Sequence, residues 1–245
     1  CFRVFRKWSS FSSGEPYFTD GSFDSDSEAT SYLKSIRAIL NNQSELASFR
    51  RKMTYREILE HLSFQDGLNY LERIEILAPK GDAFSLISAN TANDSYGRPI
   101  TFGYSEYGRI SPTTLRYIAT ALEVSKEINI LPTSSVVEIG CGYGGQASVI
   151  NRMFGVSNYT CFDLEPVLDL IQIYLEKSNS NLEIQRGELT NPSRCWDLAI
   201  SNYAFSELKR ELQIEYLEKV LTKCNSGYMV MNSGRRMKQV DQKVS

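Results

Sequence analysis

The chain has 245 residues, 42% of them hydrophobic and 23% charged, with a formal net charge of −2 and a pI near 5.7. This length allows one or two domains with a large core, and the balanced charge gives no electrostatic reason to expect binding to nucleic acid or to a membrane surface. No apolar run reaches membrane-spanning length, and no secretory signal pattern is present. The five cysteines are widely spaced, as expected for free thiols in a reducing cytoplasm.

The first 110 residues have a mainly helical pattern. Residues 9–27 are rich in Ser, Gly and Asp and predict a loop. Apolar residues at helical spacing then mark residues 33–40, and a further helix is expected over residues 68–77. The sequence therefore predicts a helical N-terminal region, residues 1–110.

Two capping boxes are expected to start helices in this region. They are Ser25 with Glu28 and Thr54 with Glu57. The single histidine, His61, lies near a predicted helix end, where a capping or packing role is favoured over catalysis.

Residues 88–110 form a polar, glycine-punctuated stretch with interleaved aromatic and charged residues. A loop of this length inside a compact domain is usually functional or mobile. Tyr104, Tyr107 and Arg109 are therefore candidates for binding a polar acceptor ring, although a solvated surface loop explains the stretch equally well. The dipeptide Ser111-Pro112 then provides an N-cap and a first-turn proline for the next helix.

The stretch Val136–Ile150, VVEIGCGYGGQASVI, predicts a buried strand, a glycine-rich turn and a helix. Such a unit directs free backbone N–H groups at a ligand over the helix N-terminus. Glycines in the turn permit positive φ and a close approach of the ligand. The glycines of the turn are Gly140, Gly142, Gly144 and Gly145.

The spacing of these glycines fits two kinds of site. One is G-x-G-x-x-G, the dinucleotide fingerprint, and the other is acidic-x-G-x-G-x-G, which starts at Glu138. A carboxylate beside the turn repels a pyrophosphate but suits the ammonium and sulfonium of S-adenosylmethionine (SAM). Glu138 therefore favours SAM, and a strand-turn-helix without a ligand remains the alternative.

After the turn, strands and helices alternate. Strands are expected over residues 158–163, 181–187, 196–202 and 227–233, with helices over residues 166–178 and 207–224. This alternation predicts an α/β fold with a doubly wound, mostly parallel sheet over residues 111–245. Ligands of such sheets bind outside the carboxyl ends of the strands, here near Gly140, Asp163, Glu188 and Asn202.

Asp163 ends the second predicted strand, 25 positions after Glu138 (163 − 138 = 25). A carboxylate at this place accepts hydrogen bonds from the ribose hydroxyls of an adenosine. Because both SAM and NAD contain adenosine, Asp163 does not distinguish them, and a plain turn residue is a further alternative.

Three blocks, EIGCGYGGQASVI, YTCFDLEPVLDLIQIYL and DLAISNYAFSEL, resemble those of class I SAM-dependent methyltransferases. The chain is most similar to a family of sugar O-methyltransferases over about residues 100–233. The resemblance implies a Rossmann-like core, SAM as methyl donor and a hydroxyl of a sugar or glycan-like small molecule as acceptor. It also implies two further strands after residue 233, so a C-terminal truncation is expected. Five residues match the cofactor motifs of this family by position: Glu138, Gly140, Gly142, Gly144 and Asp163. The further candidates for cofactor binding are Cys141, Leu164, Glu188 and Asn202.

The loop after the fourth predicted strand lies where the acceptor approaches. Glu207 is the candidate general base and Tyr203 the candidate positioning residue. A carboxylate that merely favours a helix N-terminus is the competing interpretation of Glu207. No cluster has metal-ligand spacing, so no metal is predicted. Two other functions stay open: an NAD(P)-dependent oxidoreductase, and an inactive methyltransferase-like interaction domain.

Overall fold

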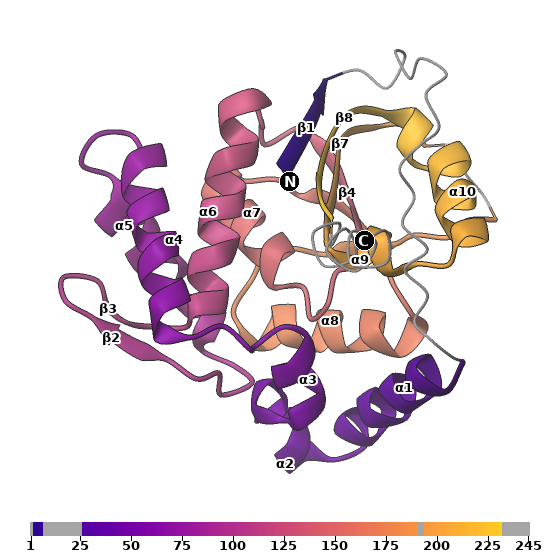
Figure 1. Cartoon of the computed structure of the whole chain (residues 1–245), viewed down its shortest axis with the longest axis horizontal. Coiled ribbons are helices and arrows are strands. Elements are labelled where there is room, and N and C mark those ends of the chain that lie inside the picture. The colour runs from indigo at the N-terminus through magenta and orange to yellow at the C-terminus, as the bar shows by residue number, and fades with distance from the viewer. Residues whose placement is uncertain (1, 7–25, 191–193, 232–245) are drawn as a thin grey trace, which may run out of the picture.

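The computed structural model describes residues 2–6, 26–190 and 194–231 (Figure 1). Within these residues, a six-stranded sheet has the order β1-β8-β7-β4-β5-β6. Strands β4 to β8 run parallel, and β1 pairs antiparallel with β8 at the edge. The strands are β1 (Phe2–Arg6), β4 (Ser135–Ile139), β5 (Asn158–Phe162), β6 (Ile184–Arg186), β7 (Trp196–Asn202) and β8 (Cys224–Val230). The predicted α/β class with a mostly parallel sheet is confirmed, whereas β1 was not predicted.

Helices cover both faces of this sheet (Figure 1). Alternate residues of β4 divide between two apolar clusters, because successive side chains of a strand point to opposite faces. Val136 belongs to the cluster under α6 (Pro112–Glu127), α7 (Gly145–Phe154) and α8 (Glu165–Lys177). Val137 belongs to the cluster under α10 (Arg210–Lys219). The sheet is therefore doubly wound, as predicted.

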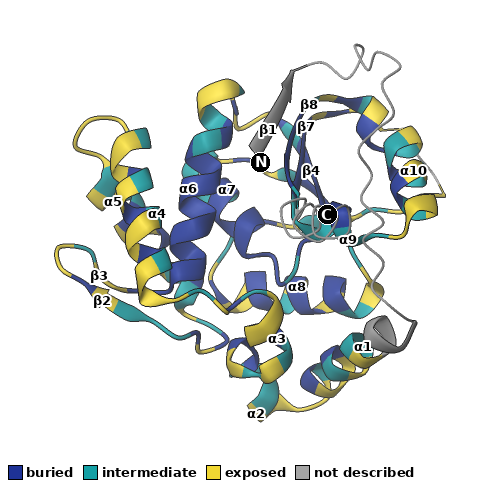
Figure 2. Ribbon diagram, viewed as in Figure 1, coloured by how far each residue is buried: buried dark blue, intermediate teal, exposed yellow. Residues whose placement is uncertain are grey.

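The N-terminal helices share the larger of these two clusters. Buried side chains of α1, α4 and α5 belong to it together with those of α6, α7 and α8, so the N-terminal region and the sheet have one continuous core (Figure 2). Helix α4 lies along α6 (Figure 1). The elements are α1 (Asp26–Leu40), α2 (Gln43–Leu46), a 3-10 turn (Phe49–Arg51), α3 (Met53–Ile58), α4 (Phe64–Leu77) and α5 (Ala83–Asn90).

One predicted helix start was wrong. Helix α3 begins at Met53, so Thr54 lies inside it, and its hydroxyl donates to Ser35 Oγ at 3.2 Å. The capping box of the region lies instead at the start of α4, where Ser63 and Asp66 cap each other. The other predicted box, Ser25 with Glu28, lies outside the residues whose side chains are described.

Two further boundaries differ from prediction. The expected loop 88–110 contains the end of α5, a 3-10 turn (Thr91–Asp94) and a hairpin of β2 (Phe102–Tyr104) and β3 (Gly108–Ile110). The expected helix 207–224 is divided into α9 (Ala204–Glu207), α10 and a 3-10 turn, because Leu208 and Lys209 take extended backbone conformations. The N-cap of α6 at Ser111 is confirmed, since Ser111 Oγ accepts from Thr114 N–H at 3.1 Å.

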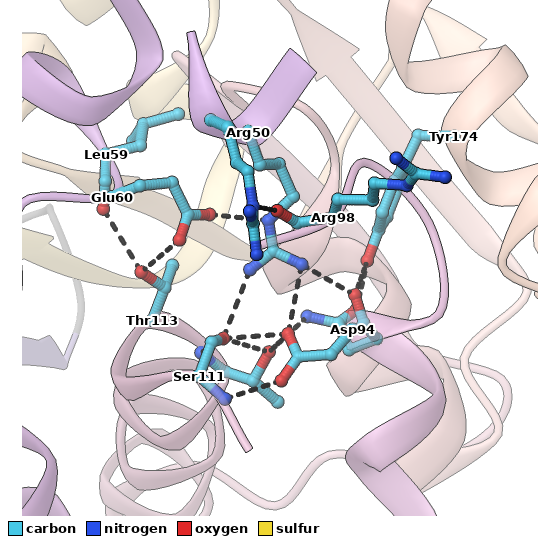
Figure 3. A network of polar contacts seen from close by, with 11 residues as sticks. Arg50, Leu59, Glu60, Asp94, Arg98, Ser111, Thr113 and Tyr174 are labelled. Atoms are coloured by element: carbon cyan, nitrogen blue, oxygen red, sulfur yellow. Dashed lines mark hydrogen bonds and ion pairs between the residues drawn. The ribbon is translucent and has the colours of Figure 1, made fainter. Parts of the chain in front are cut away.

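The guanidinium of Arg50 ties the N-terminal helices to α6 (Figure 3). Arg50 is 0% exposed, and its Nε donates to Glu60 Oε1 at 2.6 Å. Its Nη1 donates to Asp94 Oδ1 at 3.0 Å and its Nη2 to Ser111 Oγ at 3.1 Å. The second carboxylate oxygen of Glu60 accepts from Thr113 Oγ1 at 3.0 Å. The buried charge is thus paired and hydrogen-bonded on every side.

We expect Arg50→Met to lower the free energy of unfolding by about 3–5 kcal/mol, because it leaves two buried carboxylates without their cation. Urea unfolding monitored by circular dichroism measures the change. Arg51→Met is the matched control, since Arg51 is exposed and donates only to the carbonyl of Arg98. Equal stability of the two variants would contradict a structural role for the buried network.

Candidate functional site

The glycine turn connects β4 to α7 at the carboxyl edge of the sheet. Gly140, Gly142 and Gly144 have φ of +74°, +59° and +85°, in the left-handed region that side chains with a Cβ disfavour. The three glycines named by the SAM-type spacing are thus the ones with positive φ, and Gly145 already belongs to α7.

Packing also requires these glycines. A Cβ on Gly140 would lie 2.0 Å from Ala204 Cβ, and one on Gly142 would lie 2.8 Å from Leu59 Cδ1. The α9 segment and the end of α3 therefore pack directly against the turn. The glycines alone are consistent with a turn that binds no ligand, so the assignment of a ligand site depends on the polar groups around it.

Asp163 follows β5 and faces the turn. Its Oδ2 accepts from the amides of Cys141 at 2.7 Å and Gly142 at 3.3 Å, and its Oδ1 accepts from Leu164 N–H at 2.8 Å. Burial raises the pKa of this carboxyl to about 6, while the three N–H donors oppose the rise. The structure thus brings together the ends of two parallel strands around a partly buried carboxylate.

Glu138 lies inside β4 and is 2% exposed. Its Oε2 accepts from Tyr159 Oη of β5 at 2.8 Å. Burial raises the pKa of Glu138 to about 8, and the nearby Asp163 adds to the rise, while the Tyr159 bond lowers it. The side chain is thus buried against the neighbouring strand β5 rather than presented at an open strand end. With this raised pKa, the carboxyl is mostly protonated below about pH 8.

This pKa predicts a pH dependence of stability. Between about pH 4.5 and about pH 8 the folded protein keeps the Glu138 proton that the unfolded chain releases, so stability falls as pH rises. One such proton gives a slope of about 1.4 kcal/mol per pH unit. We expect Glu138→Gln to flatten the curve between about pH 6.5 and about pH 8, above the range of Asp163. Urea unfolding at both pH values tests this, and an unchanged slope would show that Glu138 is ionised in the folded protein.

The charge of Asp163 acts on tyrosines from three helices. They are Tyr32 of α1, Tyr55 of α3 and Tyr216 of α10. Burial raises the pKa of each phenol, and the negative charge of Asp163 adds to each rise. Leu59, at the end of α3, lies against Gly142 of the glycine turn, and α1 packs on α8, below which both helices lie in Figure 1.

The other predicted cofactor residues lie along the same edge. Cys141 is buried in the turn, and Leu164 is 44% exposed beside Asp163. Asn202 ends β7, and its Nδ2 donates to Gln146 Oε1 of α7 at 3.4 Å. Glu188 is exposed two residues after β6.

The predicted catalytic residues lie in the segment after β7. Tyr203 has φ +70° and ψ −36°, a conformation that is rare for a bulky residue. Its N–H donates to the carbonyl of Val230 at 2.8 Å, and its own carbonyl accepts from Ser206 Oγ at 2.6 Å. Glu207, partly buried, ends α9. Strain of this kind persists where the surrounding structure enforces it, often at functional sites.

The predicted acceptor residues do not meet the glycine turn. Tyr104 stacks on Phe64 of α4 with ring centroids 5.1 Å apart, and Tyr107 Oη donates to Glu75 of α4 at 2.7 Å. Arg109 Nη2 donates to the carbonyl of Thr101 at 2.8 Å. The hairpin lies on the outer side of α4, away from β4 (Figure 1). The two tyrosines thus hold the hairpin on α4, whereas Arg109 bonds to the residue just before β2.

Two buried residues near the turn were not singled out from the sequence. Tyr143, 0% exposed, lies between Phe49 and Tyr174, and the Arg50 guanidinium sits 4.7 Å from its ring centroid. Arg116 of α6 is 8% exposed, and its Nε has no hydrogen-bond partner. A charged residue directly between the apolar Leu115 and the aromatic Tyr117 was the available signal for Arg116.

A separate cavity of about 590 Å³ lies beside α3. Its lining combines apolar, aromatic and charged side chains, and it includes neither Tyr203 nor Glu207. The lining residues are Met53, Arg56, Glu57, Glu60, His61, Leu62, Ser63, Ile100 and Phe102. Among the described residues, no group of three His, Cys, Asp or Glu side chains is arranged to hold a metal ion. No described helix combines the length and apolar character needed to span a bilayer.

No family model and no curated protein matches the chain. Solved structures with partial similarity include a candidate RNA methyltransferase from Pyrococcus horikoshii, at 14% identity and TM-score 0.42, covering 55% of this chain and 66% of that one. The plantazolicin methyltransferase BpumL in complex with SAH has 16% identity and TM-score 0.36, covering 88% and 67%. Coclaurine N-methyltransferase, bound to N-methylheliamine and SAH, has 15% identity and TM-score 0.39, covering 81% and 55%. The chain thus spans less than two thirds of the first of these proteins, and similarity at this level does not identify its ligand or reaction.

Proposed function

We propose that this protein is a SAM-dependent O-methyltransferase that acts on a hydroxyl of a sugar or glycan-like small molecule. The observation that carries the proposal is the meeting of Asp163 with the glycine turn. A partly buried carboxylate at the end of β5, within hydrogen-bond distance of the amides of Cys141 and Gly142, is suited to hold the ribose hydroxyls of an adenosyl cofactor.

The turn favours SAM over a dinucleotide. A pyrophosphate needs open N–H groups at the start of α7. Gly145 at that start is closed off, because a Cβ there would lie 2.5 Å from Tyr117 and 2.7 Å from Tyr143. The amides of Cys141 and Gly142 face the carboxylate of Asp163, which repels phosphate oxygens. Neither feature opposes the uncharged ribose of SAM.

Different residues of the chain have different roles in the proposed methyl transfer. When bound, the sulfonium of SAM supplies an activated methyl group. The turn and Asp163 hold the adenosyl part, and α1 and α3 exclude water from the carboxyl edge. Alignment of the reacting atoms lowers the barrier by roughly 7–11 kcal/mol. Glu207 takes the proton of the acceptor hydroxyl, which adds a factor on the order of 100 to 10,000, and Tyr203 positions the acceptor.

Binding tests the cofactor first. Calorimetric titration with S-adenosylhomocysteine (SAH) is expected to give binding, and titration with NADH none. We expect Asp163→Ala to weaken SAH binding roughly 10- to 150-fold, because hydrogen bonds to a charged group are lost.

The matched control for this variant is Asp197→Ala. Asp197 accepts from Ser135 N–H at 2.8 Å at the opposite, amino edge of the sheet. It therefore loses comparable hydrogen bonds without touching the turn. Equal affinity of SAH for both variants and for the wild type would place the ribose elsewhere, and binding of NADH instead of SAH would favour an oxidoreductase.

Turnover of the Glu207→Gln variant tests whether Glu207 is the general base. Replacement by Gln keeps the size of the side chain but removes the ability to accept a proton. We expect turnover, followed as SAH release over a panel of monosaccharide acceptors, to fall roughly 100-fold or more with SAM affinity unchanged. Full turnover, with stability lowered by about 0.3–1 kcal/mol, would assign Glu207 to the helix end alone.

A further inference from the structure

Arg116 is a buried cation without a counter-ion. It lies in the second turn of α6, is 8% exposed, and no described carboxylate forms an ion pair with it. Its Nε has no hydrogen-bond partner. A buried guanidinium keeps its charge, and an uncompensated buried charge destabilises a protein by several kcal/mol. An anionic ligand that binds beside Arg116 would supply the missing counter-ion.

The contrast with Arg50 shows that the fold can pair a buried arginine. Arg50 has two carboxylates, Glu60 and Asp94, at 2.6 and 3.0 Å. The groups that face Arg116 are uncharged at neutral pH. Its guanidinium lies 5.4 Å from the Tyr117 ring centroid. Burial raises the pKa of Tyr70 from α4, and the positive charge of Arg116 opposes that rise. It also lowers the pKa of His61, together with burial, which keeps that imidazole neutral.

Arg116 belongs to the same edge of the sheet as the proposed cofactor site. The ring of its neighbour Tyr117 packs against Gly145 at the start of α7. The carbonyl of Tyr117 accepts from Gln146 Nε2 at 3.1 Å, and Gln146 in turn contacts Asn202 at the end of β7. On the other side, Tyr70 is within electrostatic reach of both Arg116 and Tyr203. The residue next to Arg116 in the chain thus packs directly on the start of the helix that follows the glycine turn.

We propose that Arg116 binds a carboxylate of the ligand that binds at this end of the sheet. The inference rests on the proposed function. A guanidinium edge formed by Nε and one Nη donates two parallel hydrogen bonds to a carboxylate, and the buried Nε of Arg116 has no hydrogen-bond partner among the described residues. The same chemistry has two sources here: the amino-acid carboxylate of SAM or SAH, and an acid group on the acceptor sugar.

The first experiment compares two ligands by calorimetry. SAH carries the carboxylate, and 5′-methylthioadenosine has the same adenosyl group without it. We expect Arg116→Met to weaken SAH roughly 10- to 150-fold and to leave methylthioadenosine unchanged if the cofactor is the source. Arg116→Lys keeps the charge but not the two-pronged geometry, so it should recover only part of the affinity. Arg37→Met, an exposed arginine on α1, controls for the loss of one positive charge.

A second experiment covers the other source. If SAH binds Arg116→Met as it binds the wild type, the SAH-loaded proteins are titrated with D-glucuronate and D-glucose by NMR. Preference of the wild type for the acid, lost in Arg116→Met, assigns the carboxylate to the acceptor. No preference in either protein overturns the proposal and leaves the proposed function intact.

Thermal unfolding separates this role from a structural one. Because Arg116 has no carboxylate to leave unpaired, Arg116→Met should melt at or above the wild-type temperature, unlike Arg50→Met. A melting temperature lowered as far as that of Arg50→Met, with Arg116→Lys binding both ligands normally, would make Arg116 a packing residue. A wild type that binds neither SAH nor methylthioadenosine would remove the proposed function and this inference together.

Discussion

The structure depends on one buried ion network, in which Arg50 joins segments far apart in the chain. Its partners Glu60, Asp94 and Ser111 come from the end of α3, the 3-10 turn after α5 and the N-cap of α6. The same guanidinium lies over the ring of Tyr143 in the glycine turn. Because the charge is buried, separating these segments would leave charged groups without their partners in a low-dielectric interior. The network therefore fixes the N-terminal helices over the carboxyl edge of the sheet.

This constraint gives the N-terminal region a role in the site. Leu59, one residue before Glu60, packs on Gly142, and Tyr55 of the same segment lies near Asp163. The N-terminal region thus packs directly on the glycine turn and shares one core with the sheet. A ligand that enters this edge meets a surface made jointly by α1, α3 and the sheet.

The two buried arginines differ in role: one stabilises the fold, and the other is proposed to bind a ligand. Arg50 is fully paired within the chain and holds the fold together, whereas no described carboxylate forms an ion pair with Arg116, whose guanidinium lies beside the Tyr117 ring. The cost of the second charge is offset only when an anion binds. Glu138 shows the same separation among acids, because it is buried against Tyr159 with a raised pKa while Asp163 faces the turn.

The sequence by itself determined the alternation of strands and helices after residue 111, the positive-φ turn and the place of Asp163, because periodicity, glycine spacing and strand ends are local properties. Local pattern also placed the N-cap at Ser111. Only the tertiary structure decided which polar residues meet. Tyr104, Tyr107 and Arg109 looked available in a polar stretch, yet the two tyrosines contact α4 and Arg109 bonds to Thr101 beside its own hairpin. Arg50 and Arg116 look alike as cations in the sequence, and their difference arises from partners that approach from 10 to 61 positions away or do not approach at all.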